Sequence, residues 1–399
     1  MKDVSLPVVR GFRWAALAAG IKKSGAPDLA LLVADAPCAA AAVFTTNLVR
    51  AAPVTIAAER VRTGRARAVL VNAGCANACT GKPGLAAARN AAAAVARALG
   101  TPAASVLPAS TGVIGQLLPA DKIAAAAPAL VAALSPEGAP AFARAIMTTD
   151  RWPKTASATV RIAGRTVTVV GVAKGAGMIH PDMATTLAFV ATDASVTPAF
   201  LRRALKTATA ATFNTISVDG DTSTNDTIVA LASGAAGGPV LRGSERGARA
   251  FSEALRSVLD TLAQSIVRDG EGAEHAVTFD VRGLPTAAAA RRVAATIATS
   301  PLVKTALHGE DPNWGRILAA AGRAGVSFDP DRAEIAVGDT VIVRRGLAVG
   351  PAAEAHAHET MRGERYEIRV TLGKGPGRAR YVTCDLGAEY VRINADYRS

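Results

Sequence analysis

A glycine-rich run that leads into two threonines is the stretch of this sequence with the clearest potential for chemistry. The run is Lys174-Gly-Ala-Gly-Met-Ile-His-Pro-Asp-Met-Ala-Thr-Thr-Leu-Ala-Phe189. The hydroxyl of a threonine in such a setting can attack the carbonyl carbon of the preceding residue, and hydrolysis of the resulting ester frees a new N-terminus. The new terminal threonine carries its own base, because an α-amine titrates near a pH of about 8 and can accept the hydroxyl proton. Taken alone the pattern is weak, because Lys-Gly-x-Gly could equally form a turn that cradles a phosphate group.

Seven other blocks of sequence, taken in order with this run, give it more weight. Together they resemble the ornithine acetyltransferases, which are the glutamate N-acetyltransferases of arginine biosynthesis. The resemblance extends over nearly the whole chain, from Gly11 to Ser399. The seven blocks are Asn72–Gly81, Ser110–Gly115, Met147–Asp150, Val218–Asp226, Arg268–Gly272, His308–Arg316 and Asn394–Ser399.

The resemblance implies that the chain cuts itself between Ala184 and Thr185. The products would be an α chain, residues 1–184, and a β chain, residues 185–399. Thr185 would then accept an acetyl group from one substrate and pass it to the next. Thr186 is the local rival for the nucleophile, and Thr185 is preferred because the cut in this family precedes the first threonine after Met-Ala. If both were ordinary strand threonines, the glycine-rich loop before them would have no purpose.

An oxyanion hole is the second requirement of such chemistry. Acetyl transfer builds negative charge on the carbonyl oxygen, so hydrogen-bond donors must point at that oxygen. The block Ser110-Thr111-Gly112 fits this need, because a glycine lets backbone N–H groups approach closely. The resemblance assigns the oxyanion hole to Thr111 and Gly112. Without the resemblance, the same residues would be interpreted as an ordinary turn.

The substrates of this family are α-amino acids, one of them N-acetylated, so the site needs a cation for the carboxylate and acceptors for the amine. The resemblance places Lys174 and Glu271 at these two ends, although a lysine or glutamate beside glycines is more often solvated surface. Thr148 would contribute a hydroxyl to the pocket. Asn394 and Ser399 would fold the C-terminal end over the substrate. Ser399 departs from the threonine that commonly ends the family's chains, and it keeps the hydroxyl but loses a methyl group.

The activity implied by the resemblance is a two-step transfer. N2-acetyl-L-ornithine would acetylate Thr185 and leave as ornithine, and L-glutamate would then take the acetyl group. Whether acetyl-CoA is a second donor is left open. No cofactor is expected, because the protein itself carries the acyl group. The implied fold is an α/β (α+β) protein, an αββα sandwich with a smaller C-terminal domain, and the α and β chains would assemble as an α2β2 heterotetramer.

Other kinds of protein compete with this interpretation. An aminopeptidase or amidase of the same superfamily would also use Thr185 and the oxyanion hole, but water would remove the acyl group. Lys174, Glu271 and the C-terminal segment favour a transferase, since they would bind a second amino acid. A binding protein without enzymatic activity would leave the chain intact, which the processing segment argues against. A specialised acetyltransferase of secondary metabolism stays open on the same scaffold.

Charge and cysteine content limit the remaining possibilities. The chain has 45 Lys and Arg against 32 Asp and Glu, but the basic residues are scattered, which does not favour nucleic-acid binding. The four cysteines are too few for a disulfide framework, and no second pair accompanies Cys75 and Cys79 at a zinc-site spacing, so no metal is expected. No stretch approaches the roughly 20 apolar residues that span a membrane, and the N-terminus lacks the apolar core of a secretory signal. A cytoplasmic enzyme is the default.

The elements that must position these residues alternate between strands and helices without regular βαβ order, which favours mixed sheets under helical layers. A hairpin around Ala163-Gly164 is expected to lead into an irregular segment, residues 171–182, and residues 373–377 are expected to form a second hairpin turn. Residues 1–184 and 185–280 would form the catalytic domain, and a smaller domain, 281–399, would begin where the sequence becomes Arg-rich. The expected strands outside the first hairpin are 29–34, 66–72, 183–190, 334–337, 341–344 and 366–372, and the expected helices are 85–99, 121–134, 197–212 and 247–269.

Overall fold

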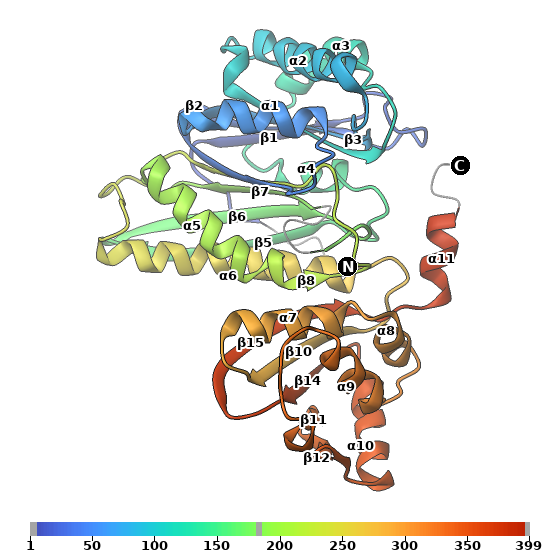
Figure 1. Ribbon diagram of the computed structural model, residues 1–399. Helices are drawn as coiled ribbons and strands as arrows, with labels where there is room; N and C mark the ends of the chain where they lie inside the picture. The colour runs from blue at the N-terminus through green and yellow to red at the C-terminus, as the bar shows by residue number, and fades with distance from the viewer. Residues whose placement is uncertain (1–5, 181–185, 396–399) are drawn as a thin grey trace. The chain divides into compact units, whose positions relative to one another are not determined.

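The computed structural model describes residues 6–180 and 186–395 of the chain (Figure 1). Ala184, Thr185 and Ser399, which the sequence assigns to the site, lie outside the described residues. The chain divides into two compact units. The first comprises Met1–Asn214 and Asp221–Ile266, and the second comprises Thr215–Gly220 and Val267–Ser399.

The strands of the first unit form one hydrogen-bonded sheet. They are β1 (Phe12–Leu17), β2 (Leu29–Phe44), β3 (Arg65–Cys75), β4 (Val106–Val113), β5 (Lys154–Ile162), β6 (Arg165–Lys174), β7 (Leu187–Thr192) and β9 (Thr227–Ala232). In the described chain their order is β4-β3-β2-β9-β7-β6-β5, with β1 paired to β2. Parallel pairs occur between β3 and β4 and between β7 and β9, so the sheet is mixed as expected.

The long strand β2 divides this sheet into two halves. Its first part pairs with β1 and β3, and its second part, from Ala39 onward, pairs with β9. The register on β3 is interrupted between Val33 and Cys38, where three exposed residues include Pro37. Proline cannot donate to a neighbouring strand, so the chain can bend at this point and pass from one half-sheet to the other.

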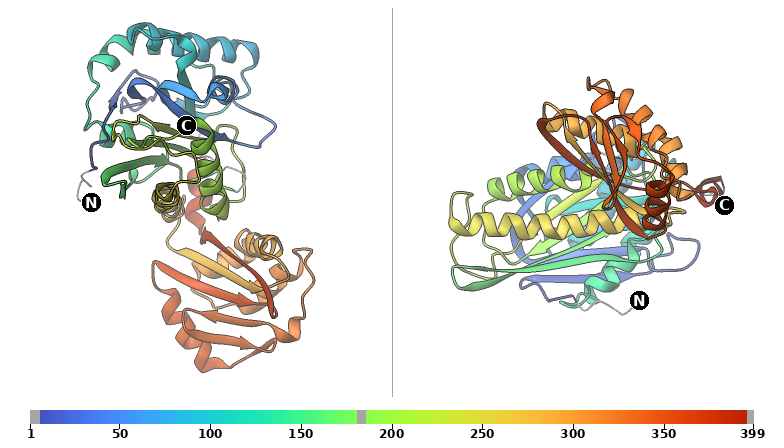
Figure 2. Two further views of the ribbon diagram at one scale, coloured as in Figure 1. Left: turned by 90° about the vertical axis from the view of Figure 1, so that its left-hand side faces the viewer. Right: turned by 90° about the horizontal axis from the view of Figure 1, so that it is seen from below.

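Helices cover both outer faces of the two half-sheets (Figure 1, Figure 2). On one side lie α1, α2 and α3, and on the other side α5 and α6, whose side chains line a common surface hollow. The helices of this unit are α1 (Ala52–Arg60), α2 (Gly81–Ala98), α3 (Ala120–Ala132), α4 (Ala139–Ala145), α5 (Pro198–Ala211) and α6 (Arg246–Arg268), the last of which runs past the unit's end at Ile266. This layering confirms the αββα sandwich that the resemblance implied.

Alternation along the strands explains the two cores of the sandwich. On β2, Ala30 and Leu32 point into the core between the half-sheets, whereas Leu31 and Val33 point into the core beneath α2 and α3. The inner core is closed by a stack of three aromatic rings. Trp14 and Phe142 have ring centroids 5.1 Å apart, and Phe142 and Phe189 follow at 5.5 Å, both edge to face. Strand β7, which follows the proposed cut site, is thus anchored in the centre of the unit.

The second unit has its own sheet and core. Its strands are β8 (Ile216–Ser217), β10 (Ala276–Gly283), β11 (Glu334–Val337), β12 (Thr340–Arg344), β13 (Leu347–Ala348), β14 (Arg365–Thr371) and β15 (Gly375–Cys384), in the order β13-β12-β11-β14-β10-β15-β8. Its helices are α7 (Ala287–Ala298), α8 (Pro301–His308), α9 (Trp314–Gly322), α10 (Pro351–Met361) and α11 (Ala388–Ala395). A cluster of buried side chains from α7 to α10 packs on one face of this sheet. Residue 281, where the sequence places the start of the smaller domain, lies inside β10.

The first expected hairpin is confirmed, but the irregular segment after it begins later than predicted. Ala163 and Gly164 both have positive φ, 48° and 78°, as a two-residue turn between β5 and β6 requires. Gly171 does not end the hairpin, because β6 continues through it to Lys174. A Cβ at Gly171 would lie 2.6 Å from Cγ1 of Val258 on α6. Gly171 therefore allows α6 to pack closely against β6 and does not form a turn.

The second expected hairpin is wrong. Strands β14 and β15 do not pair, because β10 lies between them, parallel to β14 and antiparallel to β15. The glycine-rich connection instead passes the end of β10. A Cβ on Gly283, the last residue of β10, would lie 2.3 Å from the carbonyl oxygen of Gly373. The glycines of this stretch therefore allow a close backbone crossing.

Candidate active site

Three residues that the sequence assigns to the site, one lysine and two threonines, are joined by hydrogen bonds. Lys174, the last residue of β6, is buried, and its Nζ donates hydrogen bonds to Oγ1 of Thr111 at 3.0 Å and Oγ1 of Thr148 at 2.8 Å. Thr111 comes from β4, and Thr148 follows α4. Segments far apart in the sequence are therefore brought within hydrogen-bonding distance, and this junction is called the lysine junction below.

Asp150 supports the lysine junction, and sequence reasoning did not assign it a role. Its Oδ1 accepts from Nζ of Lys154 at 2.6 Å and from the backbone N of Gly175 at 2.7 Å, and its Oδ2 accepts from the backbone N of Thr148 at 2.9 Å. One carboxylate thus fixes the residue after Lys174 and the backbone of Thr148. The only sequence signal was its place in the Met147–Asp150 block.

The charge of Asp150 is secured by its surroundings. Burial by itself would raise the pKa of this carboxyl, but the positive charges of Lys174 and Lys154 and the hydrogen bonds from Lys154 and Gly175 lower the pKa to about 2. Asp150 is therefore ionised at neutral pH. Because the side chains of Asp150 and Lys154 are both fully buried, removal of either partner would leave an uncompensated charge in the interior.

Gly112 marks a close approach of two backbones next to Thr111. Its φ is +129°, and a Cβ at this position would lie 2.3 Å from the carbonyl carbon of Gly74 and 2.5 Å from the nitrogen of Cys75. The parallel register of β3 and β4 shifts at the same place. Only glycine fits here, and the shift takes the end of β4 out of the regular ladder. Backbone donors beside Thr111 can then face a ligand.

Asn225 ties the end of β4 to the loop that precedes β9. Its Nδ2 donates to the carbonyl oxygens of Ala76 at 2.7 Å and Ser110 at 2.9 Å. Ser110 in turn donates through Oγ to Oδ1 of Asn72 at 2.6 Å. Asn225, near the end of the Val218–Asp226 block, thus connects that block to β4.

Thr186 is the first described residue after the proposed cut site. Its backbone N donates to Oδ1 of Asp226 at 3.0 Å, and its carbonyl oxygen accepts from the backbone N of Thr227 at 3.0 Å. Leu187, the next residue, is the strand partner of Lys174. The chain that follows the proposed cut is therefore held beside the lysine junction by an ordinary strand pairing.

Glu271 and Asn394, the predicted site residues of the second unit, contact each other. Nδ2 of Asn394, on α11, donates to Oε2 of Glu271 at 2.8 Å. Gly272, with φ of +71°, allows α11 to approach, because a Cβ there would lie 2.6 Å from the backbone N of Tyr390. The carboxylate of Glu271 is thus oriented by the C-terminal helix.

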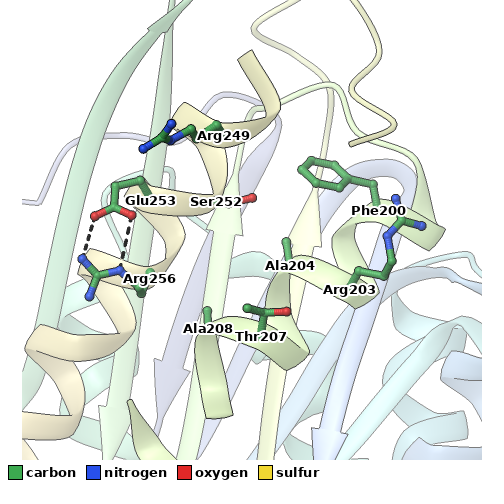
Figure 3. Close-up of a pocket in the computed structure, with 9 residues that line it drawn as sticks. All are labelled: Phe200, Arg203, Ala204, Thr207, Ala208, Arg249, Ser252, Glu253 and Arg256. Carbon is green, nitrogen blue, oxygen red and sulfur yellow. Dashed lines mark hydrogen bonds and ion pairs between the residues drawn. The ribbon is translucent and has the colours of Figure 1, made fainter. Parts of the chain in front are cut away.

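A surface hollow of about 290 Å³ between α5 and α6 contains none of these residues (Figure 3). Its floor includes Ala204 and Ala208, and a pair of hydrogen bonds joins Arg256 to Glu253 at its rim. No residue that the sequence assigns to acyl transfer lines the hollow, and its charged lining residues are Glu253 and three arginines. The lysine junction has the better chemistry for acyl transfer.

A family model described as the ArgJ family matches residues 13–399. The chain belongs to the ArgJ family. The arginine biosynthesis bifunctional protein ArgJ of Geobacter sulfurreducens is 49% identical over 391 residues, which cover 98% of this chain and 100% of the relative. A crystal structure of the arginine biosynthesis bifunctional protein ArgJ of Bacillus halodurans is 40% identical, with a TM-score of 0.50, and covers 52% of this chain and 97% of that chain.

Another ArgJ-like structure is that of the ornithine acetyltransferase of Mycobacterium tuberculosis complexed with ornithine. It is 42% identical, with a TM-score of 0.41, and covers 46% of this chain and 97% of that chain. The family matches confirm the resemblance found in the sequence, and with it an acetyl-transferring enzyme of arginine biosynthesis. Across the residues that the structure describes, we find no helix with both the length and the apolar character needed to cross a bilayer.

Replacing Asp150 by alanine is expected to destabilise this ArgJ protein by about 3–5 kcal/mol, because Lys154 would remain as a buried charge without its partner. Urea unfolding followed by far-UV circular dichroism measures the change. Glu253→Ala is a matched control, since it removes an ion pair with Arg256 at the solvent-exposed surface of the same unit, and it should leave the midpoint nearly unchanged.

The same loss should depend on pH. The folded pKa of Asp150 is about 2, below the unfolded value of about 3.9, so its stabilising effect is fully present above the unfolded value and disappears as the pH falls through the folded value. The difference between wild type and Asp150→Ala should therefore shrink as the pH falls from about 4 towards 2. A constant difference over that range would show that the charge of Asp150 is not the stabilising feature.

Proposed function

We propose that this protein cuts itself between Ala184 and Thr185 and then uses Thr185 to carry an acetyl group from N2-acetyl-L-ornithine to L-glutamate. The lysine junction is the observation that supports this most directly. There the buried ammonium of Lys174 donates hydrogen bonds to the hydroxyls of Thr111 and Thr148. Lys174 is also the strand partner of Leu187, the first residue of the strand that follows the cut. We infer that Thr111 at this junction would donate to the oxygen of an acyl group on Thr185.

Lys174 prepares Thr111 for the role of oxyanion donor. A lysine ammonium can only donate hydrogen bonds, so Oγ1 of Thr111 accepts from Nζ and its own hydrogen is directed elsewhere. A hydroxyl that accepts from a cation is also a stronger donor, because chains of hydrogen bonds polarise one another. We assign the oxyanion hole to the Thr111 hydroxyl and to the backbone at Gly112, where the strand leaves the regular ladder.

The expected fragments, an α chain of residues 1–184 and a β chain of residues 185–399, fit one feature of the comparisons. The chain in the Bacillus halodurans structure is matched over 97% of its length but covers only 52% of this protein, which is about the share of one of two fragments. The two kinds of fragment would assemble as an α2β2 heterotetramer.

Lys174 and Glu271 would bind the two ends of the amino-acid substrates. The ammonium of Lys174 suits the α-carboxylate that acetylornithine and glutamate share, and Thr148, bonded to the same ammonium, would add a hydroxyl. Glu271, whose carboxylate is oriented by Asn394, would accept hydrogen bonds from the amine that ornithine releases or glutamate brings. Ser399 would complete the cover over the substrate.

The transfer then needs two attacks on one carbonyl carbon. The Thr185 hydroxyl attacks the acetyl group of acetylornithine, its proton passes to the Thr185 amine, and ornithine leaves with that proton. The amine of glutamate attacks the acetyl-threonine ester, and the threonine hydroxyl is restored. The relatives are bifunctional proteins of arginine biosynthesis, and acetyl-CoA is a candidate second donor in the first attack. A cytoplasmic location stays a prediction.

Self-cleavage is tested by a matched pair of variants. Thr185→Ala should remain a single chain, because the attacking hydroxyl is lost, whereas Thr186→Ala should still yield two fragments, the larger beginning at Thr185. Denaturing electrophoresis and N-terminal sequencing measure both. If Thr186→Ala is the variant that stays intact, the nucleophile is the second threonine and the assignment of Thr185 is wrong.

Ornithine release in the absence of the acceptor glutamate distinguishes a transferase from a hydrolase. With acetylornithine alone, ornithine release should stop near one equivalent per active site, because the acetyl group stays on the protein until glutamate arrives. Addition of glutamate should restart release and form N-acetylglutamate in equal amount. Continuous release of ornithine and acetate without glutamate would mean that water removes the acyl group, as in the aminopeptidases and amidases. A parallel incubation with acetyl-CoA and glutamate decides whether that donor is used.

A further inference from the structure

Self-cleavage poses a chemical problem that acetyl transfer does not. In the cut enzyme the free amine of Thr185 can accept the hydroxyl proton, but before the cut that nitrogen is part of a peptide bond and has no basic lone pair. The first attack therefore needs another proton acceptor. This inference rests on the proposed function, because it concerns the step that creates the Thr185 N-terminus.

Asp226 is the titratable side chain that contacts the chain immediately after the cut. Its Oδ1 accepts from the backbone N of Thr186 at 3.0 Å, and this nitrogen is bonded directly to the carbonyl carbon of Thr185. The following residue, Thr227, donates its backbone N to the carbonyl oxygen of Thr186 at 3.0 Å. Asp226 and Thr227, one residue before β9 and the first residue of β9, thus hold both sides of Thr186, the residue covalently attached to Thr185.

The second oxygen of this carboxyl is buried and has no assigned partner. Among the described residues, four buried side-chain N or O atoms lack a hydrogen-bond partner, and two of them, Oδ2 of Asp226 and Oγ1 of Thr186, belong to this one contact. The nearby hydroxyl of Thr45 is directed to the carbonyl oxygen of Ser223 at 2.6 Å. Unsatisfied buried polar atoms are uncommon in folded proteins, and two of them at the residue that follows Thr185 in the chain point to a chemical role.

The environment gives this carboxyl the properties of a proton carrier. Burial raises the pKa of Asp226 well above its usual range, and the Thr186 N–H and the positive charge of Lys174 offset this only in part. A carboxylate with a raised pKa is a stronger base than an exposed aspartate and gives up a captured proton less readily to water. Asp193, an equally buried aspartate in the same unit, differs in that Arg10 and the backbone N of Thr168 occupy both of its oxygens.

We propose that Oδ2 of Asp226 carries the proton during self-cleavage. The carboxylate takes the proton from the Thr185 hydroxyl as the bond from Thr185 Oγ1 to the Ala184 carbonyl carbon forms. As the bond from that carbon to the Thr185 nitrogen breaks, the same proton passes to the nitrogen, which leaves as an amine. Water then hydrolyses the ester, giving the Ala184 carboxylate and the free Thr185 hydroxyl. Asp226 ends in its starting state, so no other reactant is needed.

The test is the rate of cutting of freshly made chains. Full-length wild type and Asp226→Asn are synthesised in a cell-free system with a short labelled pulse, and the uncut fraction is followed by denaturing electrophoresis. Asparagine retains an acceptor for the Thr186 N–H but cannot take a proton, so cutting should slow by about 10²-fold or more. Asp193→Asn, the matched control, removes a buried negative charge elsewhere in the same unit and should cut at the wild-type rate.

Two further results separate the possible failures. Uncut Asp226→Asn is compared with uncut Thr185→Ala by thermal unfolding, and similar midpoints would show that the slow cut is not a folding defect. Wild-type cutting by Asp226→Asn, or a slow cut accompanied by a much lower midpoint, would overturn the role of Asp226. If the wild-type chain is never cut, self-cleavage itself is wrong, and the proposed function fails together with the role of Asp226.

Discussion

A lysine ammonium can remain in a protein interior only when acceptors and a counter-charge surround it. Lys174 meets this condition because two threonine hydroxyls accept from it and the ionised carboxylate of Asp150 stands nearby. These partners come from two separate segments of the first unit: Thr111 from β4, and Thr148 and Asp150 from the connection after α4. Satisfying one buried cation therefore fixes the end of β4, the segment after α4 and the end of β6 relative to one another.

The sandwich supplies the rigid frame that this arrangement needs. Strand β7 is paired on both sides, with β6 and β9, and Phe189 on β7 is locked in the aromatic stack of the inner core. Thr186, the residue directly before β7, therefore lies at the end of a strand that cannot shift easily. Small residues make the close contacts possible: Gly112 lets two backbones meet beside Thr111, and Gly171 lets α6 settle on β6. Groups positioned in this way need little reorganisation when charge develops on the acyl oxygen.

The sequence predicted the family and the sandwich, because the resemblance was carried by long sequence blocks over nearly the whole chain. Thr111, Thr148 and Lys174 were assigned to one site, and the structure brings these three together. Asp150 and Asp226 were not assigned, although both lie in the recognised blocks. Their roles depend on which nitrogens their carboxyl oxygens meet after folding, and no spacing along the chain reveals such contacts. The same limit applies to Gly171, which is required for close packing against α6, a helix far from it in the sequence.

The central claim is that Thr185 holds the acetyl group between donor and acceptor. The most direct test is mass spectrometry of the protein after incubation with acetylornithine and without glutamate. The account predicts one acetyl group on the β chain, located on the peptide that begins with Thr185, and its complete loss after glutamate is added. An unmodified β chain in a protein that nevertheless forms N-acetylglutamate would contradict the account, because the acetyl group would then pass directly from donor to acceptor.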